Sequence, residues 1–522
     1  MISIHQIQIL SLIVFLPLVG GAIVFIIKDK RWFQPVALAT TIATFALTLV
    51  PMFMFKSDQV GFQFVEYLPW IESLGISYHL GIDGLSLFLL PLTGFLSVMA
   101  ILVSWNKIKI KVKMYYITFL ILETGMLGVF TALDGILFYI FWETMLVPMF
   151  LIIGIWGSEN RRYASIKFLI YTVAGSVFLL VGLIVMAILN QKAGGGLSFN
   201  MLSWLQLSVP SDYQYWLFAF FFVAFAVKVP IFPFHTWLPD AHVQAPTAGS
   251  VILAGVLLKM GIYGILRFCF PLFPDATLWF TPFIIALGLI GVIYGAVVAF
   301  AQQNMKKLVA YSSVSHMGLI VVGIMAGNMA GIKGGIIQML NHGLSTGALF
   351  ILVGAIYERK KTLDMDKLGG LAGRIPVLST FFVIMVLSSI GLPGLNGFVG
   401  ELLLLMGTFQ YEWWVGALAG TTLILGAVYM LRMTQRVLFE KDRSPEVINF
   451  TDFTLKDKMV MIPIVLLVLL IGIYPSYFTK RMETVSQQLI STPISKSINA
   501  PVSLKNGQNE FIKVVSYERH QR

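Results

Sequence analysis

Long apolar runs, separated by short polar segments, recur along almost the whole chain. A helix of about 20 apolar residues crosses the hydrocarbon core of a bilayer, so each run of that length is a candidate span. The runs lie at 8–27, 33–55, 83–105, 114–133, 135–157, 163–189, 213–230, 247–270, 278–300, 308–327, 330–357, 377–410, 413–438 and 458–478. The pattern predicts an all-α polytopic membrane protein with about fourteen transmembrane helices.

Two polar regions differ from simple connectors. The first, residues 56–82, predicts a surface segment on the outer side, and its distinctive residues are Glu66, Trp70, Glu72 and His79. The tail after Tyr477 has an ordinary polar composition, and we expect an appendage rather than part of the membrane core. The first apolar run lacks a small-residue cleavage site, so we interpret it as a retained span and not as a removed signal peptide.

Basic residues gather in short segments between the apolar runs. The clusters are Lys28, Lys30 and Arg31; Lys107, Lys109, Lys111 and Lys113; Arg161 and Arg162; Lys306 and Lys307; Arg359, Lys360 and Lys361; and Arg432, Arg436, Lys441 and Arg443. With fourteen spans, all of them fall on the same side of the membrane, and basic loops mark the inner side. The pattern therefore predicts both termini on the outer side.

Composition narrows the possible functions. Hydrophobic residues make up 57% of the chain and charged residues only 12%, which is a membrane composition. The net charge of +11 lies in short loops, so it indicates membrane orientation rather than nucleic-acid binding. The single cysteine, Cys269, excludes disulfides and all-cysteine metal sites supplied by this chain alone. The chain has no GxxxxGK and no strand-GxGxxG-helix pattern, so the driving energy must come from an ion gradient or a partner.

Two lysines in the stretch Trp216–Phe268 are the strongest functional signal. Lys228 and Lys259 each lie in an apolar run near membrane depth, where an ammonium costs several kcal/mol unless it faces a polar cavity or a partner. Pro230 leaves the Ala226 carbonyl without its helical donor, and a freed carbonyl beside an ammonium is typical of ion sites in discontinuous helices. The alternative is a kinked packing helix with a snorkelling lysine, but Lys259 lies roughly 16 Å from each interface.

Other ionisable residues at membrane depth extend this signal into a row. They are Glu143, His316, His342 and Glu401, with Glu123 as a weaker member. Carboxylate, ammonium and imidazole groups can each exchange protons once burial changes their proton affinities, so a row of them linked by water can pass protons. For His316 and His342, a packed, hydrogen-bonded core histidine is an equally good interpretation.

Some members of the row have further interpretations. Glu143 can act as a switch by holding the Lys228 ammonium charged and then moving away, or the two can form a static ion pair. Pro148 frees the Thr144 carbonyl, so the Glu143 helix should be locally flexible. The residues His235, Asp240 and His242 follow the broken helix and are interpreted as an access vestibule or a turn, because their spacing matches no zinc site. Ser312, Ser313, Ser315 and Asn341 are interpreted as helix-packing residues.

The spacing of the row predicts an internal repeat. Glu143 precedes Lys228 by 85 positions, His316 precedes Glu401 by 85, and the two pairs are offset by 173. Each unit then holds five spans, an odd number, so the second unit is inverted relative to the first. The second unit also has a predicted helix break, at Pro393 with its neighbouring glycines. The predicted regions are 1–112 (three helices and the outer loop), 113–272 and 273–443 (the repeats), 444–478 (helix 14) and 479–522 (the tail).

Several motifs resemble those of a known family, the antiporter-like membrane subunits shared by respiratory complex I and the multisubunit cation/proton antiporters. They are HLGIDGLSL, FWETMLVPMF, VKVPIFPFHTWLPDAHVQAPTAGSVILAGVLLK, AYSSVSHMG, NHG and GLPGLNGFVGE, and the resemblance covers nearly the whole chain. It implies fourteen helices, two inverted five-helix units and a proton channel. Carried over motif by motif, the channel residues are the pair Glu143 and Lys228, the bridging Lys259, the central His316 and His342, and the terminal Glu401.

The resemblance also implies where the redox chemistry takes place. The chain would be a translocase subunit of an NADH:quinone oxidoreductase in the bacterial inner (cytoplasmic) membrane, with no cofactor or metal of its own. NADH, flavin, iron–sulfur clusters and quinone would lie in partner subunits. Its partners would be other membrane subunits, including sister antiporter-like subunits, and the lipid bilayer, but no nucleic acid.

Three alternatives remain open from the sequence. A subunit of a sodium/proton antiporter complex is the nearest, although Glu401, at a position where most sister subunits of the family have lysine, favours the respiratory branch. A substrate-carrying secondary transporter would need a selective cavity at the repeat interface. A purely structural membrane scaffold would keep the activity of its complex after loss of Lys228.

Overall fold

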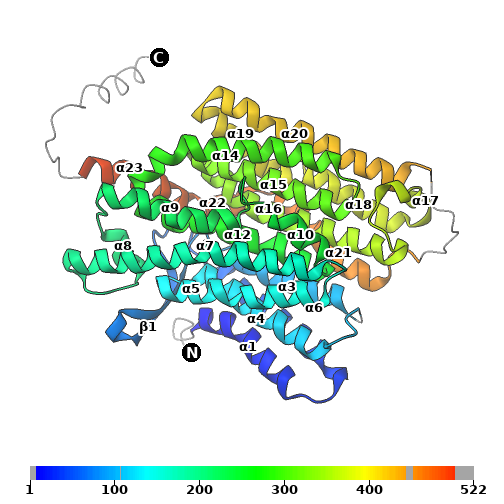
Figure 1. The fold of residues 1–522 in the computed structure, drawn as a ribbon, viewed down its shortest axis with the longest axis horizontal. Coiled ribbons are helices and arrows are strands. Elements are labelled where there is room, and N and C mark those ends of the chain that lie inside the picture. The colour runs from blue at the N-terminus through cyan, green and yellow to red at the C-terminus, as the bar shows by residue number, and fades with distance from the viewer. Residues whose placement is uncertain (1–7, 106, 442–450, 500–522) are drawn as a thin grey trace.

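In the computed structural model most helices run roughly along the longer axis of the molecule (Figure 1). The structure describes residues 8–105, 107–441 and 451–499. The chain begins with two apolar helices, crosses to a β-hairpin, and then enters a third helix. These elements are α1 (Ile9–Ile26), α2 (Phe33–Met54), β1 (Gln63–Ile71), β2 (Ile76–Ile82) and α3 (Leu89–Ser104). α1 packs on α4 of the next region and α2 packs on α3.

The helices of the first predicted repeat follow. They are α4 (Val112–Thr131), α5 (Gly135–Thr144), α6 (Leu146–Trp156), α7 (Arg161–Asn190), α8 (Met201–Gln206), α9 (Ser211–Lys228), α10 (Trp237–Gln244), α11 (Thr247–Ile252), α12 (Leu258–Gly264) and α13 (Phe270–Leu272). Asp134 begins α5 by accepting hydrogen bonds from the Ile136 and Leu137 N–H groups, as an N-cap residue does. π-helical turns join α11, α12 and α13 into one buried segment.

The second predicted repeat is built from longer helices. They are α14 (Pro274–Ala301), α15 (Met305–Met325), α16 (Met329–Lys360), α17 (Leu371–Arg374), α18 (Pro376–Ser389), α19 (Asn396–Tyr411) and α20 (Trp413–Thr434). α14 and α15 approach closely at glycines, since a Cβ atom on Gly318 would lie 2.8 Å from the Gly288 carbonyl oxygen. α16 runs through the core and contacts both α15 and α19.

Ten helical segments within the described residues are long and apolar enough to cross a membrane. The remaining predicted spans coincide with shorter or more polar helices, namely α3, α9, α18 with α19, and α21 (Leu455–Ile473). The predicted membrane protein is thus mostly helical, as expected. The count of fourteen spans and the inverted repeat stay predictions.

The predicted all-α architecture is wrong in one region, because residues 63–82 form an antiparallel β-hairpin that pairs Gln63 with Ile82 and Ile71 with Ile76. The buried Glu66 carboxylate accepts from the Leu10 N–H at 2.7 Å, and so satisfies an unpaired donor at the start of α1. Of the other distinctive residues of this segment, His79 is buried, whereas Trp70 and Glu72 are exposed.

The segment after Tyr477 is also not the appendage that its composition suggested. It forms α22 (Ser476–Arg481) and α23 (Glu483–Asn499), and Met482, Val485 and Leu489 are buried. These apolar side chains recur at intervals of three and four residues, so one face of the helix packs on the bundle. Residues 500–522 of the predicted tail lie outside the described residues.

The hairpin and the last helices meet at one end of the bundle. The Thr484 hydroxyl donates to the Ser57 carbonyl, and Gly84 lies against the Arg481 carbonyl, where a Cβ atom would come within 2.3 Å. α1 starts at the same end, since Glu66 of the hairpin caps it. Figure 1 shows β1, α8 and α23 toward one end of the molecule and α17 toward the other.

Candidate functional site

Lys259 lies on a helical segment that is buried along its whole length. Two π-helical turns, η5 (Leu253–Leu257) and η6 (Ile265–Cys269), flank the α-helical stretch α12 that carries it. Such turns change the backbone hydrogen-bond pattern and are frequent at functional sites. The Lys259 ammonium donates to the Ala254 carbonyl inside η5 and lies 2.7 Å from Nδ1 of His342. The Lys259 ammonium, and not that of Lys228, therefore contacts a backbone carbonyl at an irregular helical turn.

A second contact continues the row from His342 to His316. The two imidazole rings, from α16 and α15, have centroids 5.7 Å apart, and both side chains are buried. Nδ1 of His316 lies 2.9 Å from the Ser312 carbonyl oxygen and donates to it. That bond leaves Nε2 to face Glu401, whose Oε1 lies 3.5 Å away. Four residues from four helices thus form one buried series, Lys259–His342–His316–Glu401.

A small polar cavity lies within this series. Its volume is about 10 Å³, and its lining includes His316, His342, Asn341 and Glu401. This is about the space that one water molecule needs. His342 Nε2, Asn341 Oδ1 and Glu401 Oε2 are buried without a protein hydrogen-bond partner, so they offer a water the polar contacts it requires. The cavity can therefore hold a proton carrier between the imidazoles and the carboxylate.

Glu401 is positioned by the predicted helix break. α18 ends at Ser389 and α19 begins at Asn396, and Gly391 between them has φ +72°. A Cβ atom on Gly391 would lie 2.3 Å from Glu401 Oε2, so only glycine leaves room for the carboxylate. Asn396 closes the break, because its Oδ1 accepts from the Ser388 hydroxyl at 2.6 Å and its amide donates to the Asn341 carbonyl.

Lys228 lies at the other end of the candidate site. It is the last residue of α9 and only 2% exposed, and its ammonium has no hydrogen-bond partner among the described residues. The nitrogen lies 4.8 Å from the centroid of the Trp142 ring, a cation–π contact. Glu143, the next residue along, interacts with Lys228 electrostatically but lies beyond ion-pair distance. The static ion pair considered from the sequence is thus not formed.

The break after Lys228 is present, but the freed carbonyl predicted there is wrong. The Ala226 carbonyl accepts from the Ile231 N–H at 2.9 Å, one residue beyond the donor that Pro230 removes. The Val227 carbonyl accepts from the Trp237 indole at 2.9 Å. Both backbone oxygens beside the break are therefore satisfied within the protein, and neither is available to the ammonium.

Glu143 sits at the flank of the bundle rather than in its centre. Its side chain is half-buried, and its neighbours Ile140 and Val147 are exposed. The carboxylate is on the last turn of α5, which ends at Thr144 before α6 begins at Leu146. The chain therefore passes from α5 to α6 close to Glu143, and the local flexibility expected there stays a prediction.

Glu123 lies on α4 and is not part of the series. It is 1% exposed, neither of its oxygens makes a hydrogen bond within the described residues, and the Ser97 hydroxyl on α3 is its polar neighbour. Burying a carboxyl group that makes no hydrogen bond is costly. Its assignment as the weaker member stays a prediction.

The residues of the HTWLPDAH segment do not come together. Asp240 pairs with Lys167 at 2.7 Å, and His235 stacks on Phe232. His242 is fully buried and stacks on Phe350 at 4.4 Å, and in the described part of the chain neither of its ring nitrogens has a hydrogen-bond partner. No group of three His, Cys, Asp or Glu residues in the described ranges is placed to hold a metal ion.

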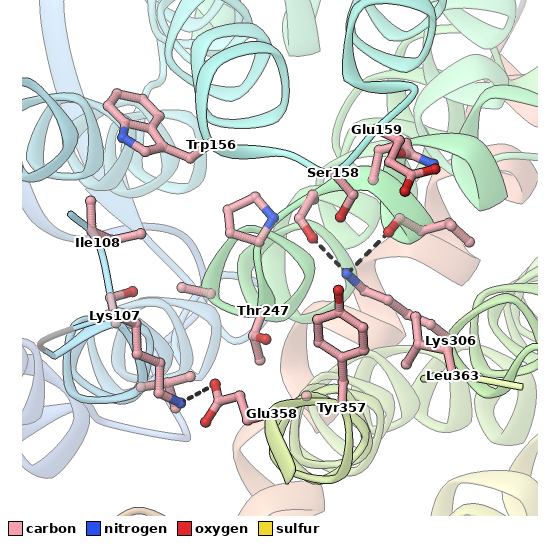
Figure 2. A pocket seen from close by; sticks show the side chains of 18 of the residues that line it. Lys107, Ile108, Trp156, Ser158, Glu159, Thr247, Lys306, Tyr357, Glu358 and Leu363 are labelled. Carbon is pink, nitrogen blue, oxygen red and sulfur yellow. Dashed lines mark hydrogen bonds and ion pairs between the residues drawn. The ribbon is translucent and has the colours of Figure 1, made fainter. Parts of the chain in front are cut away.

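A solvent-accessible cavity of about 390 Å³ opens near His242, at the end of the bundle where several basic clusters meet (Figure 2). Its lining includes Lys107, Glu159, Lys306 and Glu358. The Lys306 ammonium donates to the Val243 and Ala245 carbonyls at the end of α10, and Lys107 pairs with Glu358 at 2.6 Å, as Figure 2 shows. We call this cavity the lysine pocket.

Sequence reasoning missed several residues of this arrangement. Trp142 gave no signal beyond its place next to Glu143, and Asn396 looked like an ordinary turn residue. Asn341 was interpreted as a packing residue, yet it lines the cavity between the histidines and donates to the Asn396 carbonyl at 2.7 Å. An amide within an apolar run beside His342 was the signal that could have found it.

Comparison with known proteins gives this geometry a family context. A sequence model described as NADH:quinone oxidoreductase/Mrp antiporter, TM, matches residues 132–433. NADH-quinone oxidoreductase subunit M of Rhodobacter capsulatus is 44% identical over 490 residues, covering 90% of this chain and 94% of that protein. A chain of respiratory complex I from Thermus thermophilus has a similar structure, with a TM-score of 0.84 and 29% identity over 93% of this chain and 99% of that one.

A chain of the Mrp complex from Dietzia sp. shares the fold as well. Its TM-score is 0.80 at 21% identity, covering 95% of this chain and all of that one. At this identity the likeness extends to the fold alone.

Proposed function

The chain belongs to the NADH:quinone oxidoreductase/Mrp antiporter family of membrane subunits, and from this membership we propose that it translocates protons as a non-redox subunit of a respiratory NADH:quinone oxidoreductase. In this role it resembles subunit M. The electron chemistry takes place in partner subunits, and this chain uses the energy that they deliver.

The observation that carries the proposal is the buried series Lys259–His342–His316–Glu401. Its members come from four helices and are linked by distances of 2.7 Å, 5.7 Å between ring centroids, and 3.5 Å. Each side chain can bind and release a proton, and the small cavity that the two imidazoles and the Glu401 carboxyl group line has room for a water molecule that links them. No organic substrate would fit a cavity of about 10 Å³, which favours protons over a larger cargo.

Protons would enter the series from the lysine pocket. His242 is next to Val243, whose carbonyl lies at the wall of that pocket, and its unpaired ring nitrogens interact electrostatically with both Lys306 and Lys259. His242 thus lies between the pocket and the series. The role of an access vestibule, considered for this segment from the sequence, fits this placement.

The orientation in the membrane follows from the two ends of the bundle. Segments from several basic clusters line the lysine pocket, which supports an inner side at that end. The start of α1 and the helix α23 lie at the hairpin end, which supports both termini on the outer side. We place the protein in the bacterial inner membrane, with fourteen spans and two inverted five-helix units.

The partners follow from the same assignment. They are the other membrane subunits of the complex, including sister antiporter-like subunits, while NADH, flavin, iron–sulfur clusters and quinone are bound elsewhere in it. The half-buried Glu143, on an exposed flank of α5, is placed where a neighbouring subunit could influence it.

The experiment is a comparison of Lys259→Met with Lys333→Gln in the complete complex reconstituted in vesicles. Lys333 lies near the start of α16, outside the series, and is paired with Glu483 at 3.3 Å, so its loss controls for the removal of a lysine charge. Lys259→Met should lower the number of protons moved per electron pair, whereas Lys333→Gln should leave it unchanged. An unchanged ratio in assembled Lys259→Met complexes would contradict the proposal.

A subunit of a sodium/proton antiporter complex is the alternative. The two functions separate in the same vesicles, because an antiporter requires sodium on the opposite side of the membrane. Proton movement that depends on NADH oxidation and persists without sodium supports the respiratory assignment.

A further inference from the structure

An apolar groove opens on the flank of the bundle, away from the proton series. Its volume is about 410 Å³, and it lies between α2, α3, α16, α21 and α22. Almost all of its lining is apolar, and its rim is open, since Phe53, Leu470 and Tyr474 are 67%, 49% and 57% exposed. A flank that faces the bilayer exposes apolar side chains as a rule. In a hollow of this size, however, the lining atoms have van der Waals contacts on that side only if another molecule fills it.

The floor of the groove is the back of the relay helix. Leu340 and Leu344 on α16 line it, are 6% and 1% exposed, and lie one turn apart. His342 lies midway between them in sequence and therefore points to the opposite side of the helix, toward Lys259. Whatever fills the groove supports the helix that presents His342.

One end of the groove carries an excess of positive charge. Tyr477 lines the groove, and the Arg481 guanidinium lies 3.8 Å from the centroid of its ring. Arg481 donates to the Tyr477 carbonyl, yet its Nε has no partner, and no carboxylate within the described ranges pairs with Arg481 or with Lys480 beside it. The Thr484–Ser57 hydrogen bond brings Lys56 to the same end.

The nearby acidic residues do not neutralise these cations. Glu483 pairs with Lys333, and Asp83 is held by Arg267 at 2.6 Å. Asp58 is the remaining carboxylate close to Lys56 in sequence, so this part of the chain has three basic residues, Lys56, Lys480 and Arg481, and one carboxylate to balance them. Aromatic residues with basic neighbours at the end of an apolar surface are typical of the membrane interface, where phosphate groups lie.

We propose that this groove binds an acyl chain of an anionic phospholipid, whose phosphate is held by Arg481 and Lys480. The apolar walls exclude a polar ligand, the length of the hollow runs along the helices, and the charge at its end matches a phosphodiester. The lipid proposal requires only that the chain lies in a membrane. It can therefore fail while the chain still translocates protons, and it can hold if the chain does not translocate protons.

The test uses the complete complex in phosphatidylethanolamine vesicles that contain a small amount of phosphatidylglycerol with a photoreactive acyl chain. A parallel set contains phosphatidylcholine with the same chain. Crosslinked peptides are identified by mass spectrometry after illumination. We expect labelling of the α21 and α16 segments that line the groove, and more labelling by phosphatidylglycerol than by phosphatidylcholine.

Two variants divide the contribution of the charge from that of the groove. Arg481→Gln should lower phosphatidylglycerol labelling about fivefold, as expected for one cation near a phosphate, and leave phosphatidylcholine labelling unchanged. Leu470→Trp should lower labelling by both lipids, whereas Ile473→Trp on the same helix, 72% exposed and outside the groove, should not. Lys192→Gln is the control for loss of an exposed charge.

Three results would overturn the proposal. Labelling confined to another subunit would mean that a protein helix covers the groove. Equal labelling by both lipids, unchanged in Arg481→Gln, would remove the anionic headgroup from the assignment. Labelling unaffected by Leu470→Trp would place the lipid elsewhere. If the Leu470→Trp complex does not assemble, the phosphatidylglycerol labelling of Arg481→Gln still tests the proposal.

Discussion

The two ends of the candidate proton path are built in different ways. Lys228 has an aromatic face at 4.8 Å, no hydrogen-bond acceptor, and a carboxylate beyond ion-pair distance. Glu401 has an imidazole at 3.5 Å and lies on α19, just after a helix break that Asn396 and Ser388 close with a 2.6 Å hydrogen bond. One end holds an ionisable group with few polar neighbours, and the other holds one beside a polar network.

This difference indicates different roles. A buried ammonium without an acceptor is costly, so its protonation depends strongly on where the Glu143 carboxylate lies. Glu143 is half-buried, next to the interruption between α5 and α6, and its surroundings allow it to move. Glu401 is more confined, because it is only 2% exposed and Gly391 lies directly against its carboxyl group. The Lys228 end is suited to switching, and the Glu401 end to passing protons on.

The largest effect is expected at the switching end. Lys228→Ala and Glu143→Ala should each lower coupled proton translocation by more than about tenfold, because each removes half of an electrostatic pair that acid–base transfer requires. Lys228→Arg should also lose coupled proton translocation, since a guanidinium does not release its proton near neutral pH. The measurement is the proton-to-electron ratio of assembled complexes in vesicles.

A double variant sharpens this prediction. If Lys228 and Glu143 act as one unit, the double variant Glu143→Gln and Lys228→Met should lose no more proton translocation than either single variant. Each single variant leaves one charge without its partner, whereas the double variant leaves none. A double variant with fully additive loss would show independent roles. A normal proton-to-electron ratio in Lys228→Ala would remove the switch altogether.

At the other end, the identity of the charge should matter less than its ability to titrate. Glu401→Lys should retain part of the pumping, because an ammonium facing His316 would repeat the Lys259–His342 contact seen on α12 and α16. Glu401→Gln has nearly the same shape but no exchangeable charge, and should retain far less.

Proton uptake at matched complex content distinguishes the two forms. Equal pumping by Glu401→Gln and the unchanged protein would make Glu401 a packing residue. Arg432, at a 173-residue offset from Lys259, is the next residue to consider, although its guanidinium stacks on Phe300 at 4.2 Å, outside the series.

A smaller effect should come from the backbone that holds Glu401. Gly391→Ala introduces a Cβ atom 2.3 Å from Glu401 Oε2 at a residue with φ +72°, so it should displace the carboxylate and lower the pumping rate several-fold. Gly394→Ala is the matched control, since its φ is +91° but nothing lies within 4 Å of the new atom.

Both variants carry the backbone strain, of about 1–3 kcal/mol, and only Gly391→Ala disturbs the carboxylate. Pumping rates that fall equally in the two variants would show that strain in the break, and not the position of Glu401, is responsible.

The smallest effect concerns Asp452, in the loop that supports α18. Burial raises the pKa of its carboxyl group, but hydrogen bonds from three backbone N–H groups and the charge of Arg359 lower it by more, so the pKa lies below its ordinary value of 3.8. The three N–H groups are those of Val377, Leu378 and Phe453. A lowered folded-state pKa contributes stability above the unfolded pKa and loses it as the pH falls through the folded value. Asp452 should therefore stabilise the first turn of α18 by about 1 kcal/mol near neutral pH and not in strong acid.

Hydrogen exchange of the α18 peptide, measured in Asp452→Asn and in the unchanged protein at the same pH, checks this. The variant should exchange faster near neutral pH, and the difference should vanish below the ordinary range of an aspartate. A difference that persists in acid would mean that the side-chain contacts, and not the charge, hold the turn. Pumping itself should change little.

The sequence predicted the broad arrangement because membrane burial imposes strong patterns. Apolar runs of spanning length locate the helices, and ionisable residues within them are rare enough to mark the path. The break before Glu401 was predictable, since proline and glycine have few other uses there. The break after Lys228 was predicted too, but the fate of the Ala226 carbonyl was not, because it depends on the Ile231 N–H of the following turn.

Other features depend on contacts that no local pattern encodes. The Lys259–His342 contact joins residues 83 positions apart, and the spacing argument had instead grouped residues within each repeat. The hairpin has only a weak alternation, and its buried strand β2 packs on the junction between α4 and α5, where the Leu133 N–H donates to the His79 carbonyl and the Ser77 hydroxyl donates to Asp134. In α23, isolated apolar residues such as Val485 pack on the bundle, although the mean composition of the segment is polar.

The two π-helical turns around Lys259 set the direction in which its side chain points. A π-helical turn holds more residues per turn than an α-helix, so η5 and η6 each take up about one extra residue. If η5 changed to α-helical geometry with the same number of residues, everything on one side of it would rotate by about 100° relative to the other, enough to turn Lys259 away from His342. A deletion of one residue that accompanied this change would compensate for it, whereas the change in geometry alone would give the central lysine other partners.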